Sequence, residues 1–166
     1  MIPETKFNES DVSSFIKFVG HKEYWLQIFK PKIDGKDQRG DLKSLFTSDK
    51  RELVNEIKKD NGKGLICLAI NERPKGKTKG IDVNQLNVLV FDVDVRKNLK
   101  QGYVSTEKHH NHAIKKAYDL KIELEKLGFD AGLVVDSGNG SQVYCKINVD
   151  LKENKEIVLN SSFITS

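Results

Sequence analysis

The sequence predicts an α/β fold, and three observations support that prediction. Apolar runs typical of buried strands occur at 64–70, 86–95 and 131–136. Between the last two runs lies a long segment whose apolar residues recur at helical spacing. The chain has 166 residues, a length that suits one domain with a substantial core. We therefore expect a single α/β domain over 1–166.

Composition bounds the class of protein. The hydrophobic share of 37% and the charged share of 31% fit a globular chain better than a disordered one. The net charge of +4 permits nucleic-acid or nucleotide binding without demonstrating it. Cys67 and Cys145 lie in apolar runs and are expected to be buried thiols. With no signal-peptide pattern and no apolar run long enough to span a bilayer, we expect a cytoplasmic protein without membrane contact.

The first part of the chain predicts a small αβ unit over about 1–62. A short helix follows a cap at Asn8 or Ser10 and ends at Gly20. A strand over 24–29 comes next, and 31–47 has the composition of a polar loop. A second helix then covers about 48–60.

The second part, about 63–150, predicts a core of strands around one long helix. A strand over 64–70 leads into a basic loop, and the central strand over 86–95 follows. The helix is expected over 105–127, and a strand–turn–strand follows it. Its apolar stripe consists of Ala113, Ala117, Leu120, Leu124 and Leu127.

Asp92 and Asp94 interrupt the far end of the central strand. Alternate side chains of a strand share a face, so the two carboxylates are expected to converge. Two like charges on a buried strand favour a hard cation such as Mg²⁺ or Mn²⁺ between them. The alternative is that the strand has emerged at the sheet edge and both aspartates are solvated.

The turn Ser137-Gly138-Asn139-Gly140 joins two strands, and therefore differs from a Walker A loop or a Rossmann fingerprint. It is either a plain hairpin turn or a place where backbone N–H groups approach a phosphate, with Gln142 in the same cleft. The basic loop at 71–80 is likewise either an ordinary solvated loop or a source of positive charge for phosphates, from Arg73 and the lysines at 75, 77 and 79.

Taken in order, these motifs resemble the archaeo-eukaryotic primase superfamily, especially the primase-polymerases of plasmids, viruses and mobile elements. The resemblance rests on 67–74, on the strand ending at 91–95, on the helix, and on 134–140. It implies an RRM-like catalytic core with a mixed, largely antiparallel sheet. Helices 48–60 and 105–127 are expected to cover that sheet, with the N-terminal unit packed alongside.

The resemblance also implies the chemistry. Asp92 and Asp94 match the acids that bind the two divalent metals, Mg²⁺ or Mn²⁺, of nucleotidyl transfer. The turn at 137–140 matches the family's S-G-x-G-x-H motif, which contacts the nucleotide's phosphates. Gln142 stands where the family has histidine, and it cannot carry a positive charge. The implied partners are single-stranded DNA template, nucleoside triphosphates, and a C-terminal helicase or other domain of a longer parent protein.

One element of the family pattern has no counterpart. The family's third metal-binding acid cannot be placed, because Asp136 and Asp150 lack a comparable strand context. We expect this acid beyond Ser166, in a parent protein of which this chain is an N-terminal fragment. Two alternatives remain: a catalytically degenerate nucleic-acid- or nucleotide-binding module, and a haloacid-dehalogenase-type phosphatase with Asp92 as nucleophile and Asp94 as general acid.

Overall fold

A computed structural model describes residues 7–29, 41–77, 83–94, 106–137 and 140–151. These residues form a mixed α+β structure with three helices and two antiparallel sheets, in agreement with the predicted class at that level. Contacts divide the chain into two units. The first comprises Met1–Gln85 with Asp150–Ser166, and the second comprises Leu86–Val149. No helix of the described residues is long and apolar enough to cross a membrane.

The helices of the first unit begin at residues whose side chains satisfy free backbone N–H groups. Helix α1 (Glu9–Val19) is capped by Asn8, whose side chain accepts hydrogen bonds from two backbone N–H groups. It ends at Gly20, which has a left-handed φ of 68°. Helix α2 (Lys50–Asp60) is capped in the same way by Asp49. The predicted cap and stop of α1 are thus confirmed.

The first sheet has the strand order β2–β1–β3, with all pairs antiparallel. Its members are β1 (Tyr24–Phe29), β2 (Asp41–Thr47) and β3 (Leu65–Leu68). One face packs against the helices in a core of large side chains. That core consists of Ile16, Val19, Tyr24, Leu26, Ile28 and Leu53.

Strand β2 corrects the expectation of a polar loop at 41–47, and the rest of that expected loop, 31–40, lies outside the described residues. Residues 41–47 pair along the whole of β1, with Leu45 opposite Leu26 and Phe46 opposite Trp25. The segment also contains Asp41, Lys43, Ser44 and Thr47, so its composition resembles that of a loop. Its strand structure depends on a partner strand, which composition does not reveal.

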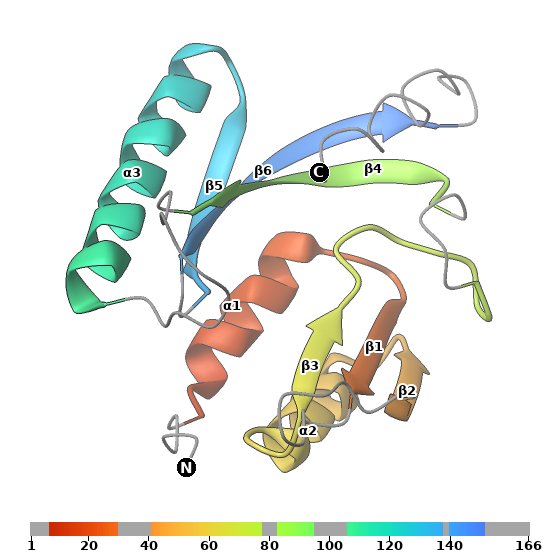
Figure 1. The fold of residues 1–166 in the computed structure, drawn as a ribbon. Coiled ribbons are helices and arrows are strands. Elements are labelled where there is room, and N and C mark those ends of the chain that lie inside the picture. The colour runs from red at the N-terminus through yellow and green to blue at the C-terminus, as the bar shows by residue number, and fades with distance from the viewer. Residues whose placement is uncertain (1–6, 30–40, 78–82, 95–105, 138–139, 152–166) are drawn as a thin grey trace. The chain divides into compact units, whose positions relative to one another are not determined.

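The second sheet has the order β4–β6–β5 (Figure 1). It contains β4 (Gln85–Val93), β5 (Asp130–Asp136) and β6 (Ser141–Asp150). Helix α3 (Glu107–Lys126) follows β4 in the chain and packs on one face of this sheet. Its buried residues are Ala113, Ala117 and Leu124, as the apolar stripe predicts, whereas Leu127 is 75% exposed at the helix end.

Two placements differ from the expected ones. Strand β3 pairs with β1, so it belongs to the first sheet, and the division between the units falls at 85/86. Helix α2 packs on α1, β1 and β2, whereas it was expected to cover the sheet of the central strand. Both differences arise because sequence periodicity does not specify strand partners. Here β3 pairs with β1 and completes the first sheet.

Candidate functional site

Asp92 and Asp94 lie at the end of β4, on the sheet face opposite α3. Leu89, Phe91 and Val93 pack into the core of the second unit, so the alternate residues of the strand point the other way. Both aspartates are exposed. The strand therefore directs two carboxylates to the same side, and it does so at the point where it leaves the core.

Gly140 lies directly against Asp94. A Cβ atom at position 140 would be 2.5 Å from Asp94 Oδ1 and 2.8 Å from the carbonyl oxygen of Val93. No real side chain tolerates such distances to a backbone atom, so glycine is required for this close approach. The beginning of β6 and the end of β4 are thereby in contact at the carboxylates.

Ser137 closes the turn between β5 and β6. Its N–H donates to the carbonyl oxygen of Gly140 at 3.2 Å, and the Gly140 N–H donates to Ser137 Oγ at 3.2 Å. The predicted phosphate-contacting residues Gly138 and Asn139 lie outside the described residues. The turn is thus a hydrogen-bonded hairpin connection whose two ends are defined.

Gln142 contacts Asp92 directly. Its Nε2 donates to Asp92 Oδ1 at 3.2 Å, and its Oε1 accepts from the hydroxyl of Tyr144 at 2.8 Å. Tyr144 is buried, and burial, followed by the negative charge of Asp92, raises the pKa of its phenol. The hydroxyl therefore remains a proton donor, and the relay from Tyr144 through Gln142 orients the Asp92 carboxylate. Sequence alone carries no signal for this relay, because Gln142 and Tyr144 lie on β6 and meet Asp92 only through its neighbour β4.

Asp136 occupies the opposite side of the same sheet. It pairs with Ser141, the pair next to Val135–Gln142 in the ladder, so its side chain lies on the opposite face from Gln142 and is directed toward α3. There its Oδ2 lies 3.0 Å from His110 Nε2. This pairing explains why Asp136 does not join the carboxylates of Asp92 and Asp94.

The donor set at the end of β4 suits a hard divalent cation. Mg²⁺ is commonly held by one or two carboxylates, with waters and substrate phosphates completing the shell. Asp92 and Asp94 are two such donors, and both are accessible. Within the described ranges no group of three His, Cys, Asp or Glu residues could hold a metal ion, so the third acid stays a prediction.

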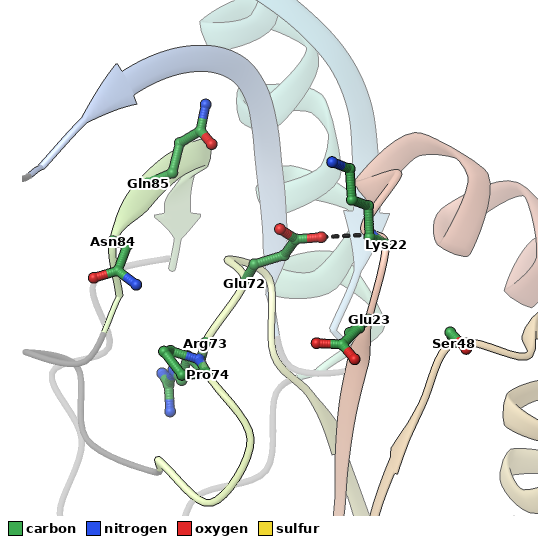
Figure 2. Close-up of a pocket in the computed structure, with 8 residues that line it drawn as sticks. All are labelled: Lys22, Glu23, Ser48, Glu72, Arg73, Pro74, Asn84 and Gln85. Atoms are coloured by element: carbon green, nitrogen blue, oxygen red, sulfur yellow. Dashed lines mark hydrogen bonds between the residues drawn. The ribbon is translucent and has the colours of Figure 1, made fainter.

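Arg73 belongs to the first unit and follows β3. Its guanidinium carbon lies 5.2 Å from the centre of the Trp25 ring, a cation–π distance. It also lines an open pocket of about 560 Å³ (Figure 2). The pocket's other residues are Lys22, Glu23, Ser48, Glu72, Pro74, Asn84 and Gln85. The expected action of Arg73 on a triphosphate stays a prediction.

Comparison of the chain with known protein families, curated proteins and solved structures gives no match.

Proposed function

We propose that this chain carries a DNA primase/polymerase-type nucleotidyltransferase core of the archaeo-eukaryotic primase superfamily. One observation supports the proposal above all others. The two motifs of the family pattern, which are separated by a whole helix in the chain, meet on one sheet face, with Gly140 against Asp94 and Gln142 bonded to Asp92.

The topology of the second unit is consistent with this proposal. Helix α3 connects β4 to β5, and β6 lies between those two strands in the sheet. A helix that joins two strands with a third inserted between them is the split βαβ arrangement of ferredoxin-like folds. The RRM-like core of the proposed family has this arrangement.

The proposed reaction is template-directed nucleotidyl transfer. The 3′-hydroxyl of a growing strand attacks the α-phosphorus of a nucleoside triphosphate, a new P–O bond forms, and the bond to the β-phosphate breaks to release pyrophosphate. Asp92 and Asp94 would hold Mg²⁺ or Mn²⁺, which lowers the cost of deprotonating the hydroxyl and of charge on the phosphates. Tyr144 and Gln142 keep the Asp92 carboxylate oriented. The turn at 137–140 is proposed to contact the triphosphate, as the resemblance implies.

A synthesis assay tests the proposal. The full chain is given single-stranded DNA, a primer, labelled nucleotides and Mn²⁺ or Mg²⁺, and is compared with Asp92→Asn and Asp94→Asn. We expect both variants to lose synthesis by at least about 10²–10³-fold, since the metal contributes several kcal/mol of charge stabilisation. The matched control is Asp119→Asn, an exposed aspartate of α3, which should retain activity. Equal activity in Asp92→Asn and the wild type would contradict the proposal.

A binding module without turnover is the second candidate, and the state of Gln142 favours it. The side chain at the family's histidine position is engaged by Asp92 and Tyr144 and carries no charge. If this residue limits turnover, Gln142→His should raise synthesis while nucleotide binding changes less. Metal-dependent nucleotide binding with no synthesis, in both the wild type and Gln142→His, would support the binding module. Hydrolysis of a simple phosphate monoester would support the phosphatase.

A further inference from the structure

The sheet of the first unit has a second face, which the helices do not cover. Along β1 the side chains of Tyr24, Leu26 and Ile28 enter the core, so Trp25, Gln27 and Phe29 point the other way and are only partly buried. Directly paired residues of an antiparallel sheet share a face. Phe46 and Ser44 of β2 therefore lie beside Trp25 and Gln27, and Cys67 of β3 lies beside Gln27.

The tight turn at 74–77 places Lys75 and Lys77 beside this face. The N–H of Lys77 donates to the carbonyl oxygen of Pro74 at 3.0 Å, and Gly76 has a φ of 78°. Proline followed two residues later by a positive-φ glycine suits a tight β-turn. The turn and the sheet together line a hollow of about 310 Å³, whose residues are Trp25, Gln27, Ser44, Leu45, Phe46, Lys75, Gly76 and Lys77.

The charge of this hollow is positive. Lys75 and Lys77 contribute two ammonium groups, and none of the described residues that line the hollow is acidic. Arg73 adds a third cation over the Trp25 ring. Its neighbour Glu72 accepts a hydrogen bond from the Lys22 backbone N–H, and Figure 2 shows Glu72 turned toward Lys22 while Arg73 lies beside Pro74.

We propose that this face of the β2–β1–β3 sheet binds single-stranded nucleic acid. Flat aromatic rings on a sheet offer stacking surfaces to unpaired bases, and nearby cations neutralise the phosphates between those bases. Trp25 and Phe46 provide the rings, and Lys75 and Lys77 provide the charge at the rim. Stacking requires bases freed from pairing, so a duplex does not fit. The inference goes beyond the proposed function, because it assigns a binding surface to residues of the first unit that the proposed transfer site does not use.

Trp25 is also the probe for the test, since it is the only tryptophan of the chain. The full chain is titrated with a short oligothymidylate, the corresponding oligouridylate, a duplex of equal length, and thymidine triphosphate alone. We expect saturable quenching of tryptophan fluorescence by the single strands, with weaker binding of the duplex and of the free nucleotide. The oligothymidylate and oligouridylate arms identify whether the strand is DNA or RNA. Duplex binding as tight as single-strand binding, or binding of the triphosphate as tight as the oligomer, would overturn the proposal.

Two lysines and their matched controls test the electrostatic part. The double variant Lys75→Gln/Lys77→Gln changes only exposed side chains of the turn, so it should fold normally. For this variant we expect the slope of log K for binding, plotted against log salt concentration, to become less steep by about 1.4. Each phosphate contact to a single strand contributes about 0.7 to that slope. Lys115→Gln/Lys116→Gln removes two exposed lysines of α3 and should change binding little. Equal losses in the two double variants would reject the assigned surface.

The aromatic part is tested with Trp25→Leu and, separately, Phe46→Leu, followed by anisotropy of a labelled oligonucleotide. We expect either change to weaken binding by about 5- to 150-fold, the range for loss of one stacked base. Circular dichroism verifies folding, and Phe46→Leu keeps the test valid if Trp25→Leu unfolds. Full binding by both folded aromatic variants would overturn the inference and leave the proposed function untouched.

Discussion

The two units of this chain have the same plan and opposite surface chemistry. Each has a three-stranded antiparallel sheet with helical cover on one face. In the first unit the other face carries Trp25 and Phe46 beside the cations of the following turn. In the second unit it carries Asp92, Asp94 and an amide. The comparison shows that a few side chains set the charge of an open sheet face, whereas the covered face stabilises the fold.

The cores of the units also differ. The first core is built from large side chains, including Tyr24, Leu26 and Leu53, which are fully buried between two helices and the sheet. The second core has small residues at its centre, among them Ala117 and Ala131, where the single helix α3 meets the sheet. Small residues allow the helix to approach closely, and each of them contributes less buried apolar area.

Truncation of one core residue in each unit should lower the free energy of unfolding by different amounts. Leu26→Ala removes a fully buried side chain and is expected to lower the free energy of unfolding by about 2–5 kcal/mol. Val143→Ala should cost about 2 kcal/mol, because two methyl groups are worth about 0.8 kcal/mol each and the cavity is smaller. Urea unfolding followed by fluorescence and circular dichroism measures both. A larger loss of unfolding free energy in Val143→Ala than in Leu26→Ala would contradict this comparison of the cores.

The close-approach glycines offer a second pair of variants. A Cβ at Gly64 would collide with the carbonyl oxygen of Phe29, and a Cβ at Gly140 would collide with Asp94 and Val93. Each alanine variant should lose about 1–3 kcal/mol through overpacking. Hydrogen exchange should locate the loss in the first sheet for Gly64→Ala and in the second for Gly140→Ala. Only Gly140→Ala should also weaken Mn²⁺ binding. Equal metal affinity in the two variants would show that Gly140 does not affect the carboxylates.

His21 makes the first unit sensitive to pH. It is buried at 5% exposure beside Tyr24, and burial lowers the pKa of its imidazole below 6.5 despite the opposing effect of Glu72. The unfolded chain therefore takes up a proton at a pH where the folded chain does not. Stability should fall as pH drops from about 6.5 toward the lowered folded pKa, with a slope of at most about 1.4 kcal/mol per pH unit.

The variant His21→Phe should remove that part of the pH dependence, and unfolding measured in a pH series tests it. The exposed His112→Phe serves as the control and should leave the slope unchanged. If stability depends on pH as steeply in His21→Phe as in the wild type, other groups cause the pH dependence.

The smallest expected effect concerns the relay behind Asp92. Tyr144→Phe deletes one hydrogen bond to Gln142 and should lower stability by about 1 kcal/mol. Because the relay orients a proposed metal ligand, Mn²⁺ affinity should fall by about 10-fold. Tyr118→Phe, at an exposed tyrosine of α3, is the matched control for both quantities. Unchanged metal affinity in Tyr144→Phe would reduce the relay to a structural role.

Sequence periodicity predicted much of the local structure and one half of the candidate site. The caps of α1, the buried stripe of α3 and the strand ending in Asp92 and Asp94 follow from residue type and spacing. The strand β2 was missed, because its apolar residues are isolated among polar ones and become a strand only beside β1. Aromatic residues that are scattered along the sequence also gave no sign of a stacking surface, since Trp25 and Phe46 are neighbours only across a ladder.

The sequence by itself determined that Asp92 and Asp94 share a face, because the alternation of a strand puts both on one side whatever surrounds them. Tertiary structure alone decided what those residues meet. Strand pairing placed Gln142 against Asp92, turned Asp136 toward His110, and joined β3 to β1. The physical reason is that side-chain direction is a local property of the backbone, whereas strand partners and register depend on which apolar faces can be buried together.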